Sequence, residues 1–132
     1  MLAIPLRPLL MADVIFSGSA TAVLLLAAAV LAAPLGLPEV VLRFIGLIMI
    51  PFVAYLVWLV RRDPVPAGAA WPIVIINALW VVASILVLVA GWFEPTGLGL
   101  AFVIGQAVVV GLFAELGFFA LRRRSTTAPA AL

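Results

Sequence analysis

Four long apolar stretches dominate the hydrophobic pattern of this chain. They cover residues 12–33, 38–60, 71–91 and 97–121. A helix needs about 20 apolar residues to cross the roughly 30 Å hydrocarbon core of a bilayer, and each stretch meets that length. Proline and glycine occur in the links between the stretches, as is typical of helix boundaries. The pattern therefore predicts four transmembrane helices.

The links between these stretches are short, so helices that are neighbours in sequence must lie antiparallel. We therefore expect an all-α membrane protein whose four transmembrane helices form an antiparallel bundle. Residues 1–124 would form this single domain, and residues 125–132 would form a disordered C-terminal tail. Thr96 directly precedes the fourth stretch, where a threonine side chain can cap a helix.

The first stretch has a second interpretation as a secretory signal peptide. Arg7, the apolar run and the small residues at 29–33 resemble the parts of such a peptide and its cleavage site. The run is longer than the usual apolar core of a signal peptide, however, and Pro34 follows it at once. We therefore expect this segment to be a true membrane span.

The composition excludes two large classes of protein. Of the 132 residues, 68% are hydrophobic and only 9% are charged. A soluble domain carries about a quarter charged residues, so a water-soluble globule is excluded. The net charge of +2 comes from a small arginine excess and not from a basic face, so we expect no nucleic acid partner.

Three residue types that serve much of enzyme chemistry are missing, because the chain has no histidine, cysteine or lysine. Zinc sites, thiolate clusters and histidine-ligated haem therefore lack their ligands. Schiff-base chemistry and a Ser-His-Asp triad are excluded for the same reason. We expect no metal, no cofactor and no enzymatic activity.

The distribution of arginines predicts the orientation in the membrane. Six arginines fall on one side of the predicted spans: Arg7, Arg61, Arg62, Arg122, Arg123 and Arg124. Only Arg43 lies near the other side, where we expect it to pair with Glu39 one helical turn earlier. Arginines in short loops mark the cytoplasmic face, so both termini should be cytoplasmic. Size and composition suggest a multi-pass protein of a bacterial-type inner membrane.

Four polar side chains, one from each span, are predicted to lie at a similar depth. They are Asp13, Tyr55, Asn77 and Glu115, and Ser17 follows Asp13 on the same helical face. At 1.5 Å per helical residue, Tyr55, Asn77 and Glu115 lie roughly 9–10 Å inside the cytoplasmic boundary. This polar layer is a candidate site for binding a proton or a cation. The structural alternative is a cluster of interhelical hydrogen bonds that sets the helix register.

Glu115 shares a stripe of the fourth span with Ala107 and Gly111, whose small side chains would let another helix approach closely. We therefore expect Glu115 to point into a helix contact. There it should take a partner or bind a proton, because an ionised carboxylate at that depth costs a few kcal/mol. Gln106 lies on the opposite face of the same span and is expected to bond another helix or a second protomer.

Three classes of function are compatible with these features. We favour a non-enzymatic accessory or self-associating membrane subunit, because the loops are short and ionisable groups are few. Its partners would be the lipid bilayer and either further copies of itself or a larger membrane complex. The alternative is a small-solute or proton-coupled transporter or channel that uses Glu115. A lipid-directed enzyme with Asp13 or Glu115 as its base ranks last, because no nucleophile–base pair is visible.

Overall fold

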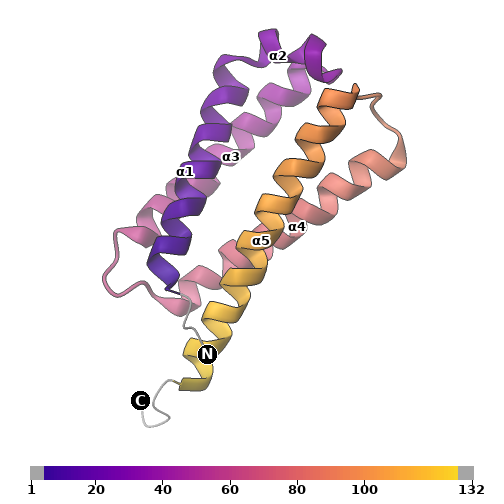
Figure 1. The fold of residues 1–132 in the computed structure, drawn as a ribbon. Coiled ribbons are helices and arrows are strands. Elements are labelled where there is room, and N and C mark those ends of the chain that lie inside the picture. Colours follow the sequence, from indigo (N-terminus) through magenta and orange to yellow (C-terminus); the bar gives the residue numbers. More distant parts are fainter. Residues whose placement is uncertain (1–4, 128–132) are drawn as a thin grey trace.

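Five helices and no strand make up residues 5–127, the part of the chain that this computed structural model describes (Figure 1). They are α1 (Leu6–Leu26), α2 (Ala28–Leu35), α3 (Glu39–Val60), α4 (Ala67–Ala90) and α5 (Gly97–Thr127). All except α2 are long and apolar enough to cross a membrane. The predicted all-α fold with four transmembrane helices is therefore confirmed, and the chain is a multi-pass membrane protein.

The first predicted span, 12–33, is divided between α1 and α2. α1 begins six residues earlier than predicted, and Pro8 lies in its first turn, where a missing backbone N–H costs no hydrogen bond. The backbone leaves the helical conformation at Ala27, with φ −118° and ψ 13°. α2 then ends at Leu35 and is followed by Gly36, whose φ of 68° is the left-handed conformation that glycine adopts easily after a helix.

The other helices lie close to the predicted spans, with changes at their ends. α4 begins at Ala67, four residues before the predicted start, and α5 continues to Thr127. α5 thus includes residues 125–127 of the segment that was expected to be a disordered tail. Residues 128–132 of that segment lie outside the described part of the chain.

The four long helices pair as two antiparallel hairpins. α1 packs mainly along α3, and α4 packs mainly along α5, with fewer contacts between the pairs. The start of α1 and the end of α5 lie at the same end of the molecule as the α3–α4 link (Figure 1). Because the chain order places Arg7, Arg61, Arg62 and Arg122 there, we call this the arginine end. We call the opposite end the α2 end.

Apolar side chains join the two hairpins at both ends of the molecule. At the arginine end, all four long helices contribute to one cluster that includes Leu6, Leu10, Leu56, Leu59, Ile73 and Leu121. At the α2 end, Leu24, Leu35 and Leu42 form a second cluster, with Phe93 and Val103 packed against it. The hairpins are therefore held together by apolar packing above and below the middle of the bundle.

Thr96 connects the two hairpins at the α2 end. Its hydroxyl donates to the Pro34 carbonyl oxygen at 2.6 Å and accepts the Gly99 backbone N–H at 3.0 Å. Its own backbone N–H donates to the Leu35 carbonyl oxygen at 3.1 Å. The predicted cap of the fourth span is therefore confirmed, and the same residue also ties the start of α5 to the end of α2.

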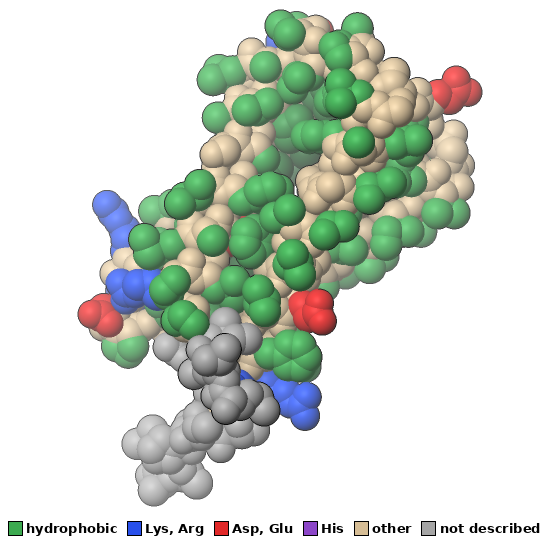
Figure 2. Space-filling model, viewed as in Figure 1, with side chains coloured by type: hydrophobic (Ala, Val, Ile, Leu, Met, Phe, Trp, Pro, Cys, Tyr) green, Lys and Arg blue, Asp and Glu red, His purple; other side chains and the backbone are tan. Residues whose placement is uncertain are grey.

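The outer surface of the molecule is largely apolar. Figure 2 shows hydrophobic side chains over most of the visible face. Large side chains such as Leu26, Val40, Leu79 and Leu98 are more than half exposed. Such a surface suits contact with lipid, because a bilayer core imposes no cost on exposed apolar side chains.

Candidate functional site

A buried carboxylate lies at the junction of the two hairpins. Asp13 of α1 is only 2% exposed. The Ser17 hydroxyl donates to Asp13 Oδ1 at 2.7 Å, and Asn77 Nδ2 of α4 donates to Asp13 Oδ2 at 2.9 Å. Each carboxylate oxygen therefore has one donor, one from its own helix and one from the other hairpin. Ser17 and Asn77 are both buried as well.

The local sequence of α1 explains this placement. Its buried residues recur every three or four positions, as the face of one helix requires: Leu6, Leu10, Asp13, Ser17, Thr21 and Leu24. Leucines occupy the two ends of this face, and polar side chains occupy its middle. The Thr21 hydroxyl donates to the Ser17 carbonyl oxygen at 2.7 Å, so its polar atom is satisfied within α1. Asp13 is thus the member of this face that bonds across to the second hairpin.

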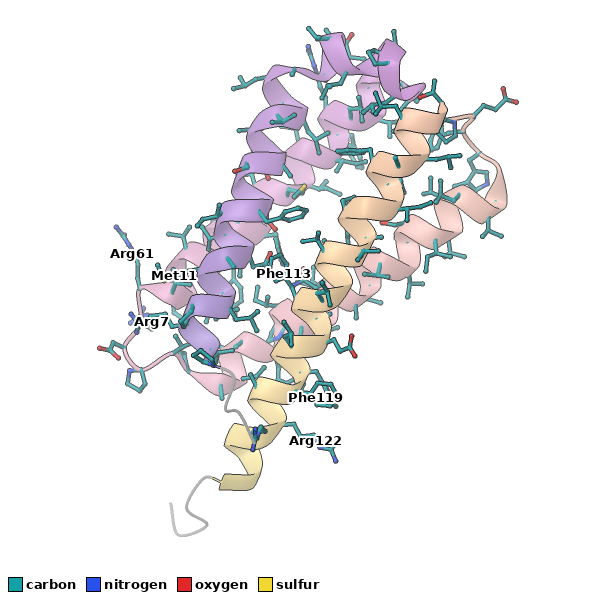
Figure 3. The ribbon with its side chains drawn as sticks, in the orientation of Figure 1. Arg7, Met11, Arg61, Phe113, Phe119 and Arg122 are labelled. Carbon is teal, nitrogen blue, oxygen red and sulfur yellow. The ribbon has the colours of Figure 1, made fainter. Side chains whose placement is uncertain are left out.

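Aromatic packing flanks the contact between α1 and α5. Phe16 of α1 meets Phe113 of α5 edge to face, with 5.9 Å between ring centroids. Figure 3 shows Phe113 lying between these two helices. This ring pair therefore adds an apolar contact between the two hairpins.

Two members of the predicted polar layer lie apart from this cluster. The Tyr55 hydroxyl donates to the Ala69 carbonyl oxygen at 2.5 Å, near the start of α4, and the Tyr55 ring stacks on Trp58. Glu115 is exposed on α5 and makes no hydrogen bond or ion pair with the described residues. The structure therefore brings together Asp13, Ser17 and Asn77, but neither Tyr55 nor Glu115.

The expectation that Glu115 points into a helix contact is wrong for this chain. The buried face of α5 includes Val110, Ala114, Gly117 and Leu121, spaced by three or four residues, and Ala120 beside Leu121. A Cβ atom on Gly117 would lie 2.9 Å from Val74 Cγ2, so this glycine marks the close approach to α4. Glu115 follows Ala114 and is rotated by about 100° from that face. The predicted rotation of the fourth span about its axis was therefore wrong.

The predicted packing residues Ala107 and Gly111 lie at the edge of the α4–α5 contact. Both are half-buried, and they line two neighbouring outward-facing hollows between the two helices. A Cβ atom on Gly111 would lie 3.7 Å from Val81 Cγ2, which is ordinary van der Waals contact. Gly111 thus lies near α4 without being required for close helix approach.

A second polar cluster, nearer the α2 end, joins α4 to α5. Trp80 Nε1 donates to Gln106 Oε1 at 2.7 Å, and Gln106 Nε2 donates to Ser84 Oγ at 3.0 Å. The Ser84 hydroxyl in turn donates to the Trp80 carbonyl oxygen at 2.8 Å. The sequence indicated that Gln106 would bond another helix or a second protomer, and the structure assigns it to α4. The cluster fixes the second hairpin internally.

We predict that Gln106→Leu destabilises the protein by about 1 kcal/mol, because the Trp80 N–H would lose its acceptor in apolar surroundings. SDS-driven unfolding in mixed micelles measures this change. Phe102→Leu, at an exposed position of the same helix, is the control and should change stability little. Equal stability of Gln106→Leu and Phe102→Leu would contradict the role given to the cluster.

Ion pairs occur at the two ends of the molecule. Glu39 and Arg43 pair at 3.0 Å near the α2 end, as the sequence predicted. Arg7 pairs with Asp63 at 3.3 Å at the arginine end and also donates to the Arg62 carbonyl oxygen. Arg7 and Arg61 lie on the same side of this end in Figure 3. No group of acidic side chains within the described residues could hold a metal ion.

Together these features define a small polytopic membrane protein built from two hairpins, with a hydrogen-bonded carboxylate buried between them. A profile for a family of unknown function, DUF6111, matches residues 38–93, which include α3 and α4. The chain is 39% identical over 62 residues to a protein of Escherichia coli O81 (strain ED1a) named "Probable 4-amino-4-deoxy-L-arabinose-phosphoundecaprenol flippase subunit ArnE". It is 36% identical over 62 residues to the protein of that name from Shigella flexneri serotype 5b (strain 8401). No solved structure gives a significant match.

These similarities are partial. Each curated match covers 44% of this chain, and the chain spans about half the length of the curated relatives it matches. The relatives are named as subunits of a flippase, which is a membrane transport protein and not an enzyme. The name of the relatives agrees with the non-enzymatic membrane protein expected from the composition. It also agrees loosely with the alternative expectation of a role in membrane transport.

Proposed function

We propose that this chain is a non-enzymatic subunit of a membrane transport complex. The relatives are named as flippase subunits. That name supports both the role as a subunit and the role in membrane transport. The fold is compatible with it, because most of the described chain lies in helices that are long and apolar enough to span a membrane. A lipid-linked amphiphile, of the general kind named for the relatives, is the class of substrate that we assign to the assembled complex.

We further propose that Asp13 is the functional intramembrane carboxylate of this subunit. The observation that carries this proposal is the hydrogen bond from Asn77 to Asp13, which links the two hairpins in the middle of the bundle. The side-chain hydrogen bonds that Tyr55 and Thr96 make between the hairpins lie nearer the two ends. Intramembrane carboxylates are costly and commonly serve transport or proton relay. Proton binding to Asp13 would change the hydrogen bonds that hold the hairpins together.

The distribution of arginines supports an orientation for this subunit. Among the described residues, the arginine end carries every arginine except Arg43. Short-loop arginines favour the cytoplasmic side, and Trp71 lies near the start of α4, where aromatic residues favour the membrane interface. We therefore propose that the arginine end, with both ends of the described chain, faces the cytoplasm of a bacterial-type inner membrane.

Native mass spectrometry of the protein extracted from its own membrane in mild detergent tests the proposed subunit role. We expect a complex of fixed stoichiometry that contains this chain and a membrane protein of different mass. A homo-oligomer without any other chain would instead favour the self-associating form. A monomer under conditions that preserve other membrane complexes would contradict both.

A further inference from the structure

An outward-facing groove runs between α4 and α5 near the arginine end, away from the junction that holds Asp13. It has a volume of about 430 Å³. The lining residues that matter here are Val74, Ala78, Gly111, Glu115, Phe118 and Phe119. Glu115 is the charged member of this set, and the other lining residues are apolar. The groove therefore combines one carboxylate with an otherwise apolar wall.

The Glu115 carboxylate has no counterion within the described chain. It is exposed and makes no hydrogen bond or ion pair there. Arg122 lies seven residues further along α5, which corresponds to about 10 Å along the helix axis. Phe119 and Arg122 project from the same side of α5, with Arg122 nearer the arginine end (Figure 3). An ionised carboxylate on a membrane-spanning face is costly unless a cation approaches it.

Two phenylalanine rings line the groove together with Glu115. Phe118 and Phe119 lie edge to face, with 5.5 Å between ring centroids, and Trp71 packs against Phe118 at 5.8 Å. Phenylalanine and tryptophan rings attract cations that lie over their faces. A carboxylate beside such rings offers a cation both a hydrogen-bond acceptor and an apolar, polarisable surface.

The groove continues towards the α2 end along the same two helices, where the lining is apolar except for Ser84. A second hollow of about 280 Å³ shares Val81 with the first and is lined by Ile85, Leu88, Ile104 and Val108, among others. On α4, the residues 74, 78, 81, 85 and 88 recur every three or four positions and so form one face. An occupant can thus place a cationic end at Glu115 and an apolar body along the helices.

We propose that this groove binds a lipophilic ammonium ion. Its nitrogen donates to the Glu115 carboxylate between the phenylalanine rings, and its apolar body lies along α4 and α5. The ligand carries no phosphate, because the described lining of the groove offers no cation to bind one. The site is separate from Asp13, so the inference does not depend on the proposed function.

A second copy of this chain is a poorer occupant of the groove. A copy in the same orientation, related by a twofold axis through the groove, would bring its own Glu115 to the same level, and like charges in apolar surroundings repel strongly. A copy in the opposite orientation would reverse the arginine distribution, against the positive-inside rule. Charge complementarity therefore favours a cationic ligand over self-association on this face.

Equilibrium dialysis of labelled dodecylamine against the purified chain in phosphatidylcholine nanodiscs tests the proposal, with empty nanodiscs to measure partition. We expect saturable binding of one amine per chain. Glu115→Gln should weaken it by about tenfold or more, because a charge-assisted hydrogen bond is lost. Glu94→Gln, which makes the same change in the α4–α5 link, should bind like the parent chain. Dodecanol, the neutral analogue, should show partition only.

Several results would overturn this proposal. Unchanged amine binding by Glu115→Gln would remove the carboxylate from the site, and saturable dodecanol binding would show that the amine is not recognised. If Glu115→Gln cannot be recovered folded, Gly111→Leu tests the same site by placing a large side chain in the groove wall, and it too should weaken binding. Failure of the parent chain to bind the amine, together with a dimer in the nanodisc, would assign the groove to a second copy.

Discussion

Replacing Asn77 with leucine is expected to destabilise this protein by about 2 kcal/mol. Asn77 supplies one of the two donors to the Asp13 carboxylate, which is only 2% exposed. Without it, one carboxylate oxygen would remain buried against apolar side chains without a donor. The cost should exceed the roughly 0.6 kcal/mol average of interhelical hydrogen bonds in membranes, because the orphaned group is an acid and not a neutral amide. SDS-driven unfolding in mixed micelles measures the change.

The double variant Asp13→Leu/Asn77→Leu tests the cause of this effect. Removing both partners leaves no unsatisfied polar group, so the double variant should be about as stable as the parent chain or more stable. Asp13→Asn keeps a side chain of nearly the same shape and should cost less than Asn77→Leu. If the two leucine substitutions instead destabilise additively, the hydrogen bond between the hairpins does not carry the stability assigned to it.

Replacing Gly99 with alanine is expected to destabilise the protein by about 2 kcal/mol. A Cβ atom on Gly99 would lie 2.0 Å from the Leu35 carbonyl oxygen, where α5 begins against the end of α2. The clash involves backbone, so no side-chain rotation can relieve it, and α5 would have to move away from α2. Overpacking of this kind costs about 1–3 kcal/mol or more, against a gain of up to about 1 kcal/mol from the better helix propensity of alanine.

Gly105→Ala is the matched control for this prediction. Gly105 lies in the same helix, and a Cβ atom there would meet nothing within 4 Å. The same chemical change should therefore leave the protein as stable as before or stabilise it by up to about 1 kcal/mol. Thermal unfolding of both variants in the same detergent compares them directly. Equal effects of the two substitutions would show that α5 does not depend on close contact with α2.

The ends of the helices were less predictable than their number. The helix breaks at Ala27, but the apolar run at 12–33 has no proline or glycine next to that residue. Nothing in the pattern therefore indicated the break between α1 and α2. Likewise, residues 125–127 read as a polar tail, although α5 extends through them. Hydropathy reports whether a segment can lie in lipid, and it is nearly insensitive to where a helix begins or ends.

The candidate site was predicted in part. The spacing of Asp13 and Ser17 indicated one polar face on the first span, and the estimated depth correctly suggested Asn77 as a residue at the level of Asp13. Tyr55 instead bonds near the start of α4, and Glu115 is exposed on α5, so neither joins that cluster. The groove beside Glu115 was not foreseen, because it requires two helices to be placed side by side.

The sequence by itself determined that this is a membrane protein with four spans, because the length and composition of apolar segments decide whether backbone hydrogen bonds can be satisfied in lipid. It also determined which end collects the arginines. The tertiary structure alone decided the rotation of each helix. Gly117, and not Gly111, marks the close approach of α5 to α4, which turns Glu115 outward. Lipid is as apolar as the helix surfaces, so hydropathy carries little information about rotation, and close packing and hydrogen bonds between particular side chains decide it.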